Sequence, residues 1–406
     1  MAWSGTTVAF ARILVALDGS ADASAGAALA LALARAHRAQ VFACHACDVA
    51  IHAARFREME PGLPTDYQQN ETMRRLREAH GPLMGEGFQS LAKGYLDGYL
   101  AEARRRGIAA DGRVAEGRNY AVLLGLAREL RADLAVLGAH GLGAVGDGRL
   151  GSTAGRVLRG AAADVLIARA PNGAGPVLAG VDGSPEALAA VDRAASIAQA
   201  LGCPLQVAAA YDPDLHKAVF GAMARSLSPE RQAQVGLSRQ EALHKTFIDD
   251  GLAKLYQGFL DQAAARAAAL GARPTALLLR GKAYRVLTDH AGAIGARLMV
   301  VGRFGHHRGT ADIGSNAEAA AHLAPCSVLV TAPAADSAQP VEGSELAWDA
   351  EALARLERIP AFARPMAKQG IEQHVRARGG QRVTLEDVRE VGSRMGMSGQ
   401  EASRNV

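Results

Sequence analysis

The sequence predicts two tandem α/β domains, each built on a doubly wound parallel sheet, followed by a small all-α module. Three observations lead to this fold class: an internal repeat, a regular alternation of short apolar runs with helix-length segments, and a globular composition. The chain has 406 residues, 49% of them hydrophobic and only 4% aromatic. That length suits two or three domains, and the alanine-rich composition favours helices packed on sheets over a disordered chain.

The repeat is visible in the first strand and helix of each half. "ILVALDGSADASAGAALALALARA" (13–36) matches "VLAGVDGSPEALAAVDRAASIAQA" (177–200). The same offset of 164 residues holds at four landmarks: Asp18 and Asp182, Asp48 and Asp212, Gly117 and Gly281, Gly138 and Gly302. One offset held over four landmarks indicates a duplicated domain. We place the copies at 10–170 and 176–332, joined by the Gly/Pro-rich stretch "APNGAGP" (170–176).

Each half contains the same elements in the same order. The expected strands are 13–17, 40–46, 110–115, 133–138 and 164–169 in the first half, and 177–181, 205–210, 275–279, 297–302 and 327–332 in the second. The expected helices are 21–37 and 119–131, then 185–201 and 283–295, with one more before each last strand. Strands that alternate with helices indicate a parallel sheet covered on both faces. Ligands of such sheets bind beyond the carboxyl ends of the strands, where Asp18 and Gly138 lie.

A long extra segment separates the second and third strands of each half, at about 49–106 and 213–270. Charged and apolar residues recur there at helical spacing, so we expect helices. We interpret each insertion as a helical lid or a docking surface that takes no part in a reaction.

The last part of the chain follows a polar Ala/Pro linker, 333–345. The module at 346–396 is expected to form three short helices. Asp349 can cap the first, Pro360 stops it, and Gly379-Gly380 ends the second. Thr384, with Asp387 three residues on, is a capping-box variant that opens the third helix.

Charge, hydropathy and cysteine content argue against several classes of protein function. The net charge is +4 with both signs interspersed, and no aromatic-basic stripe is present, so we expect no nucleic-acid partner. No apolar run is long enough for a membrane span, and the first residues read as a strand and not a signal peptide, so a cytoplasmic location is expected. Cys44 and Cys47, three apart on a strand, point to opposite faces and predict no redox or zinc pair. No metal site is expected.

Six of the sixteen residues in "GAHGLGAVGDGRLGST" (138–153) are glycine. Gly141-Leu-Gly143-Ala-Val-Gly146 matches a dinucleotide fingerprint, but that motif belongs directly after a first strand, whereas this stretch follows the fourth. The other parse is Gly138-x2-Gly141-x9-Gly151-Ser152-Thr153, running from a strand end to a helix start. Glycines admit phosphate oxygens to the backbone amides, two hydroxyls add donors, and the helix N-terminus favours an anion. The loop has no lysine, which excludes a Walker-type loop.

This half resembles the universal stress protein domain. The resemblance rests on Asp18 in "ALDGS", on His45 and Asp48 at the exit of the second strand, on "EG" at 116–117, and on the glycine loop. It implies a Rossmann-like, adenine-nucleotide alpha-hydrolase-like fold and binding of ATP or AMP, with or without Mg²⁺. The residues it implies for the first half are Asp18 near the adenosine, Ala46 pairing with adenine through its backbone, and Gly138, Gly141, Gly151, Ser152 and Thr153 around the phosphates. The alternative is a loop that serves folding only.

The second half departs from this pattern. Its loop, Gly302-x2-Gly305-x8-Gly314-Ser315, is one residue shorter. We expect the shortening to displace the helix start relative to the strand end, which leaves a weaker or empty site near Asp182. Phe304, His306 and His307 either replace phosphate contacts or block them.

The tail "IPAFARPMAKQGIEQHVRARGGQRVTLEDV" resembles the small helical domain of a light-independent protochlorophyllide reductase subunit. No cysteine follows Cys326, so the tail supplies no iron–sulfur ligand.

The resulting hypothesis is an adenine-nucleotide-binding stress-response regulator. The alternative is a nucleotide-independent scaffold that docks an unknown protein through its insertions and tail. No nucleophile and base are positioned beside the loop, so slow ATP hydrolysis is the most that is expected, with no catalytic residue. The halves should pair through 164–169 and 327–332 as an intramolecular pseudo-dimer. Whether the chain also forms a homodimer is left open.

Overall fold

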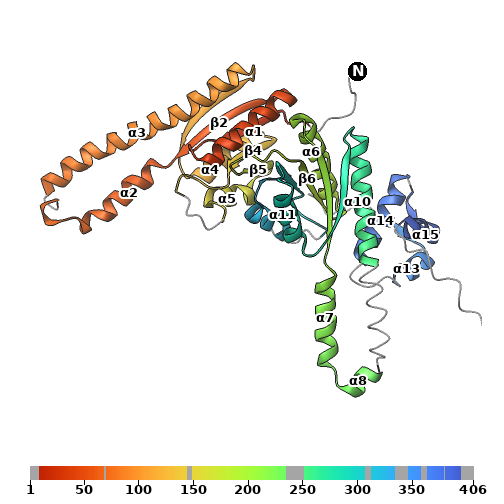
Figure 1. The fold of residues 1–406 in the computed structure, drawn as a ribbon. Helices are drawn as coiled ribbons and strands as arrows, with labels where there is room; N and C mark the ends of the chain where they lie inside the picture. The colour runs from red at the N-terminus through yellow and green to blue at the C-terminus, as the bar shows by residue number, and fades with distance from the viewer. Residues whose placement is uncertain are drawn as a thin grey trace, which may run out of the picture.

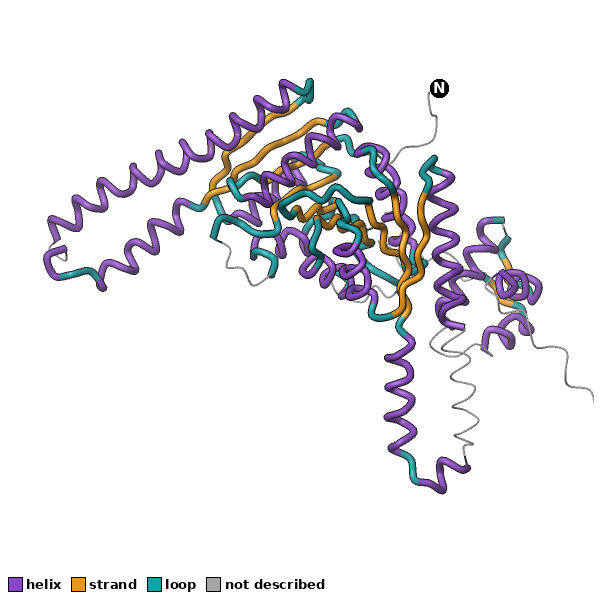
Figure 2. The backbone as a smooth tube through the Cα atoms, in the orientation of Figure 1, coloured by secondary structure: helices purple, strands orange, loops and turns teal. Residues whose placement is uncertain are grey.

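A single ten-stranded sheet runs through both halves of the chain in the computed structural model (Figures 1 and 2). The structure describes residues 9–67, 70–143, 149–234, 251–306, 312–333, 346–357, 364–378 and 380–394. The strand order is β3-β2-β1-β4-β5-β10-β9-β6-β7-β8. Each half therefore contributes five strands in one order, and the two sets meet in the middle of the sheet.

The first half contains the expected strands and helices. They are β1 (Arg12–Ala16), α1 (Ala21–His37), β2 (Gln40–Cys47), β3 (Ala110–Glu116), α4 (Asn119–Glu129), β4 (Leu134–Gly138), α5 (Ser152–Gly160) and β5 (Asp164–Ala168). All neighbouring strands within this half pair in parallel. The predicted doubly wound fold class is confirmed.

The second half repeats this architecture. Its elements are β6 (Val177–Val181), α6 (Pro185–Leu201), β7 (Leu205–Tyr211), β8 (Pro274–Arg280), α11 (Ala283–Ala293), β9 (Leu298–Val301), α12 (Ser315–Leu323) and β10 (Ser327–Val330). Ser20 and Ser184 open the paired helices α1 and α6 by accepting hydrogen bonds from Ala23 N and Ala187 N, both at 3.1 Å. The repeat therefore extends to the caps.

Two apolar layers cover the two faces of the sheet. One face packs against α1, α6 and the body-proximal helices of the insertions, with Leu33, Leu96, Ile197 and Leu260 in its core. The other face packs against α4, α5, α11 and α12. The central strands β5 and β10 are buried along their whole length, as a sheet covered on both sides requires.

The halves join through their last strands, as predicted. Strand β5 pairs antiparallel with β10, with Leu166 opposite Leu329. This pairing hides two edges that would otherwise invite association with other chains. Asp164 Oδ1 accepts a hydrogen bond from Ala332 N at 2.7 Å, and Ser327 Oγ accepts one from Arg169 N at 3.1 Å.

Two buried arginines cross this junction in opposite directions. Arg303, of the second half, is 2% exposed and donates to Leu158 O at 2.8 Å, at the end of α5. Arg169, of the first half, donates to Ala321 O at 2.6 Å and His322 O at 3.1 Å, at the end of α12. Burial lowers the pKa of both guanidinium groups. Each half thus supplies a cation to the carbonyl end of the last helix of the other half, where a helix favours positive charge.

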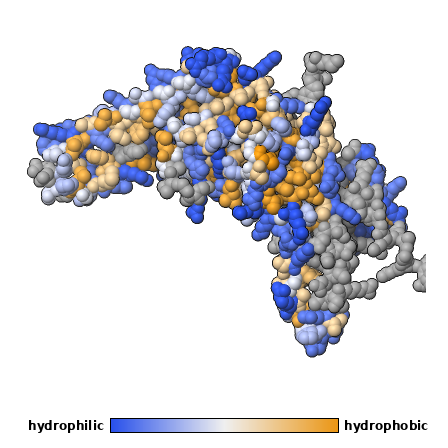
Figure 3. Space-filling model, viewed as in Figure 1, coloured by the Kyte–Doolittle hydropathy of each residue, from blue (hydrophilic) through white to orange (hydrophobic). Residues whose placement is uncertain are grey.

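The insertions form two helical arms that project from the body (Figure 1). The first consists of α2 (Val49–Met59), the short 3-10 turns Glu60–Gly62 and Thr65–Tyr67, and α3 (Asn70–Arg105). The second contains α7 (Pro213–Ser226) and α8 (Pro229–Gln234), which project from the body (Figure 1), and α10 (Leu252–Ala269), which packs against β7 and β8. Exposed apolar side chains lie on both arms, Met59 and Leu83 on the first and Val219 and Met223 on the second. Figure 3 shows apolar residues interspersed with polar ones over the first arm.

The tail contains the three expected helices, α13 (Ala350–Glu357), α14 (Arg364–Ala377) and α15 (Leu385–Arg394). Thr384 N donates to Asp387 Oδ2 at 2.8 Å, which confirms the predicted capping-box variant. Sequence reasoning missed a short parallel pair, β11 (Ala347–Trp348) with β12 (Arg382–Val383). Pro360 and Gly379 lie outside the described residues. Across the part of the chain that the structure describes, no helix is both long and apolar enough to cross a membrane.

Candidate functional site

The predicted residues of the first half gather where the strand order reverses. Asp18 follows β1 and Gly138 ends β4, and β1 and β4 are adjacent parallel strands. Ala46 lies near the end of β2, on the other side of β1. In a doubly wound sheet the switch point leaves a crevice beyond the carboxyl ends of the strands, and ligands bind there.

Asp18 and the glycine loop approach each other closely. One carboxylate oxygen of Asp18 accepts a hydrogen bond from Ser20 N at 2.9 Å. The other, Oδ2, lies 3.1 Å from the point where a Cβ on Gly141 would stand. A side chain at 141 would therefore fill the space beside this carboxylate. The structure brings these two predicted site residues together.

The far end of the loop closes on the strand it left. Gly151 N donates to Ala139 O at 2.8 Å, and α5 begins at Ser152. The N-cap of α5 is Gly151, which has no side chain, and no other side chain of the described residues caps this helix. Ser152 is exposed and Thr153 half-buried. An uncapped helix start flanked by two hydroxyls is a typical anion-binding arrangement. Residues 144–148 of the loop lie outside the described residues.

Gly138 is required for packing as well. A Cβ at Gly138 would stand 2.7 Å from Ala23 N and 3.0 Å from Asp22 Cβ, both in the first turn of α1. Gly302 of the second half has the same neighbours in α6, with Ala187 N at 3.1 Å. These two glycines let the fourth strand of each half pass against the helix that follows the first strand.

An aromatic shelf, missed by sequence reasoning, lies beside Asp18. The ring of Tyr95 in α3 lies so close to Gly19, which has φ +78°, that any Cβ there would overlap it. His45, from the strand-exit motif, packs against Tyr95 with ring centroids 5.5 Å apart. His45 Nδ1 lies 2.7 Å from Leu17 O, so this nitrogen carries the proton and donates. Tyr95 could not be found from the sequence because nothing in it fixes how the arm meets the strand ends.

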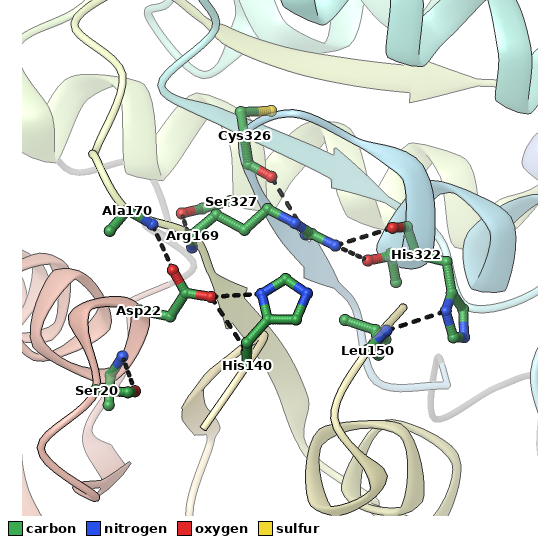
Figure 4. A network of polar contacts seen from close by, with 11 residues as sticks. Ser20, Asp22, His140, Leu150, Arg169, Ala170, His322, Cys326 and Ser327 are labelled. Carbon is green, nitrogen blue, oxygen red and sulfur yellow. Dashed lines mark hydrogen bonds and ion pairs between the residues drawn. The ribbon is translucent and has the colours of Figure 1, made fainter. Parts of the chain in front are cut away.

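Asp22 ties the loop to two other segments (Figure 4). Its Oδ2 accepts from His140 N at 3.1 Å and from His140 Nδ1 at 2.8 Å. Its Oδ1 accepts from Ala170 N at 2.8 Å, where the chain leaves β5 for the second half. Near the other end of the loop, Leu150 N donates to His322 Nδ1 of α12 at 3.4 Å. The loop of the first half is therefore held partly by the second.

The shorter loop of the second half does not behave as predicted. Gly314 N donates to Arg303 O at 2.8 Å, the same bond and length as Gly151 N to Ala139 O. The helix start therefore keeps its place relative to the strand end, and our expectation of a displaced helix was wrong. The missing residue is absorbed between Gly305 and Gly314, a stretch of which 307–311, including His307, lies outside the described residues.

The surroundings of Asp182 differ from those of Asp18. A Cβ on Gly305 would stand 2.5 Å from Asp182 Oδ2. Phe304 is buried, 7% exposed, so it packs inside the domain instead of covering the loop. His306 turns inward: its Nε2 lies 2.8 Å from Asp182 O, and its ring packs against Phe259 of α10 at 5.7 Å between centroids. Ser315 begins α12 and is exposed, like Ser152 in the first half.

The described residues contain no group of three or more His, Cys, Asp and Glu side chains that could hold a metal ion. Burial raises the pKa of the Cys44 thiol to about 11, and Cys47 is only partly buried. A shallow cavity of about 170 Å³ lies away from the strand ends, lined by Leu124, Arg128 and Gly160 among others. None of the predicted site residues lines this cavity, so the site beside Asp18 remains the better candidate.

Comparison with known proteins matches almost the whole chain. The model of the "Universal stress protein family" matches residues 9–169 and 174–332, and that of the "Proto-chlorophyllide reductase 57 kD subunit" matches 348–391. Among solved structures, a putative universal stress protein from Pseudomonas aeruginosa is 16% identical over 80% of this chain and 95% of that one, with a TM-score of 0.46.

Two further solved structures are similar. A universal stress protein from Archaeoglobus fulgidus is 14% identical over 80% of this chain and 97% of that one, with a TM-score of 0.46. A universal stress protein in complex with cAMP is 23% identical over 40% of this chain and 98% of that one, with a TM-score of 0.26. No curated protein matches the sequence.

Proposed function

Because this chain belongs to the universal stress protein family through both of its halves, we propose that its first half binds an adenine nucleotide, ATP or AMP. The observation that carries the proposal is the meeting of a strand-end carboxylate with a closed glycine loop. Asp18 Oδ2 faces Gly141, and Gly151 closes the loop onto Ala139 beside the uncapped start of α5.

The proposed site residues form two groups, one for the adenosine and one for the phosphates. Asp18 is an acceptor suited to ribose hydroxyls, and the backbone of Ala46 offers a donor and an acceptor to the edge of adenine. Gly141, Gly151, Ser152 and Thr153 supply amides and hydroxyls to the phosphates, where the positive end of α5 adds a favourable field. Gly138 gives α1 room to bring its first turn to this edge. A bound triphosphate would bring Mg²⁺ with it.

We propose one tight site per chain. The loop of the second half keeps the same closure, but Asp182 is covered by His306 of that loop. The second site, at Asp182, Gly302, Gly305, Gly314 and Ser315, is therefore weak or empty.

The nucleotide would act as a signal and not as a substrate. Asp22 connects the loop to the linker, and His322 connects it to the second half. A nucleotide bound by the loop would therefore affect contacts outside the first half. This supports a regulator whose nucleotide state is read by a partner protein.

A second candidate is a nucleotide-independent scaffold. The projecting arms favour it, because Met59 and Leu83 are 63% and 68% exposed, and large exposed apolar residues are typical of interaction surfaces. Partner binding of this kind would survive Gly141→Val and would be lost on Leu83→Glu.

The test of the leading proposal is the nucleotide that the purified protein retains. Denatured full-length chain should release ATP, ADP or AMP that mass spectrometry identifies, at no more than one molecule per chain. Protein carrying Asp18→Asn should release much less. If neither the purified protein nor protein incubated with millimolar ATP and desalted carries any nucleotide, the site serves only folding. That result would favour the scaffold function.

A further inference from the structure

The two halves build the same aromatic shelf beside their strand-end aspartates. Tyr95 and Phe259 are separated by the repeat offset of 164 residues. Phe259 lies against Gly183, φ +83°, as Tyr95 lies against Gly19. In both halves an imidazole packs against the shelf, with centroids 5.5 Å apart in the first half and 5.7 Å in the second.

The imidazole comes from a different element in each half. In the first half it is His45, on strand β2, hydrogen-bonded to Leu17 O. The register is equivalent in both halves, since Ala16 lies opposite Cys44 and Gly180 opposite Ala208. Ala209 therefore stands where His45 does and supplies no ring. In the second half the ring belongs to His306, directly after Gly305 in the glycine loop.

The loop of the second half is consequently fastened to the shelf. His306 Nε2 donates to the carbonyl oxygen of Asp182 at 2.8 Å, while its ring contacts Phe259. The counterpart of His306 is Leu142, directly after Gly141, and Leu142 is 69% exposed. In the first half the loop thus turns its side chain to solvent, and the space beside Asp18 and Tyr95 stays free of it.

We infer that His306 is a built-in plug, which occupies the adenosine end of the second site and makes nucleotide binding in this chain asymmetric. This inference rests on the proposed nucleotide binding at the strand ends. His45 makes similar contacts in the first half, but it belongs to strand β2 and is only 8% exposed, so it forms part of the wall of that site. His306 instead comes from the glycine loop, directly after Gly305 beside Asp182 Oδ2, so its ring takes the space that a nucleoside would need. The loop closure at Gly314 and the exposed Ser315 are otherwise those of the first half.

Only one of the two ring nitrogens of His306 has a hydrogen-bond partner among the described residues. His306 Nδ1 is buried and has no hydrogen-bond partner among the described residues. A buried acceptor without a donor opposes the closed arrangement. Removing the ring should therefore open the site with little loss of fold stability.

A reciprocal exchange tests the plug. His306→Leu gives the second half the residue of the first, and Leu142→His does the reverse. Titration of the full chain with ATP in a calorimeter should give a stoichiometry near one for the original chain and near two for His306→Leu. Leu142→His should weaken the first site at least tenfold. Thermal unfolding without ligand checks each fold, and His306→Ala serves as a second variant if His306→Leu is unstable.

The outcomes separate this inference from the proposed function. A stoichiometry that stays near one in folded His306→Leu and His306→Ala overturns the plug and leaves the first site standing. Two sites in the original chain also overturn it. If the original chain binds no ATP, the proposed first site is wrong. In that case one new site in His306→Leu supports the plug, and none overturns it.

Discussion

Asp22 lies in the first turn of α1 and holds three segments with two oxygens. It accepts from His140 N, His140 Nδ1 and Ala170 N, and its side chain is only 13% exposed. Hydrogen bonds to a charged acceptor are among the stronger ones in proteins. The start of the glycine loop and the exit toward the second half are therefore fixed by one residue.

Asp22→Asn should show this. The amide has one acceptor oxygen in place of two, so it loses at least one charge-assisted bond and sets an N–H₂ group against an N–H donor. The expected cost is about 1.5–3 kcal/mol in the free energy of unfolding, with weaker ATP binding. Urea denaturation measures the first effect. The control is Asp111→Asn. Among the described residues its exposed carboxylate accepts a hydrogen bond only from the adjacent Gly112 N, so this variant should change stability by less than about 0.5 kcal/mol. Equal stabilities for both variants would contradict the role of Asp22 in joining these segments.

At this scale the sequence identified residue types better than their partners. Asp18 and Gly141 lie side by side, and Gly151 closes the loop onto Ala139, because a repeat with strand-end landmarks fixes which backbone segments meet. Tyr95 was beyond reach as a site neighbour, because its position depends on how an arm folds back onto the strand ends. His306 was expected to replace or block phosphate contacts, but its ring contacts Phe259 and its Nε2 lies beside Asp182 O. Phe304, which we expected at the loop, is instead buried.

The ends of α5 and α12 are stabilised by arginines from opposite halves. Arg303 reaches the carbonyls of α5, and Arg169 reaches those of α12. Arg169 and Arg303 are not separated by the repeat offset of 164 residues, so they do not occupy equivalent positions in the two halves. The halves therefore make the same kind of contact, an arginine at the end of a helix, from different positions. The sequence contained a signal for Arg303, because an arginine just beyond a fully apolar strand is unusual.

Arg303→Met should destabilise the chain strongly. It leaves Leu158 O buried without its donor and removes a cation near the buried Asp164. The expected loss is about 3 kcal/mol in urea denaturation. Arg159→Met is the matched control. Arg159 forms an ion pair with Glu318 across the same junction, but its side chain is 47% exposed, so the loss should stay below about 1 kcal/mol. Similar losses for both arginines would contradict the assigned role of burial.

Helix and strand positions were largely predictable. The alternation of apolar runs with alanine-rich helices placed α1 and α6 at their observed bounds, because capping serines mark both starts. The predicted displacement of the α12 start failed, because a loop can absorb a deletion while its closing hydrogen bond is kept. The pair β11 and β12 is too short to leave a periodic signal.

At the scale of the whole molecule, the junction contains two histidines that must be neutral. Phe10 N donates to His37 Nδ1 at 3.2 Å, and Leu150 N donates to His322 Nδ1 at 3.4 Å. His37 also contacts Ser196 Oγ of the second half at 3.2 Å. Burial is the main cause that lowers the pKa of both histidines below the ordinary value of 6.5. A protonated ring would lose each of these acceptors.

Stability should therefore fall on acidification. Because both pKa values are lower in the folded chain than in the unfolded one, the stability they provide is complete above pH 6.5. It is lost as the pH falls from 6.5 through the folded-state values. The melting temperature should be lower at pH 5.5 than at 7.5. This difference should shrink when His37→Gln and His322→Gln are combined, and should not change with His80→Gln on the arm. An unchanged difference in the double variant would show that other groups carry the pH dependence.

The central claim is that this two-domain universal stress protein binds one adenine nucleotide, in its first half. Calorimetric titration of the full chain with ATP tests it most directly, with Gly141→Val and Gly305→Val as paired variants at equivalent positions of the two loops. We expect one site in the original chain, at least a tenfold loss of affinity in Gly141→Val, about 1.4 kcal/mol, and unchanged binding in Gly305→Val. Two equivalent sites, or a loss of binding in Gly305→Val alone, would contradict it.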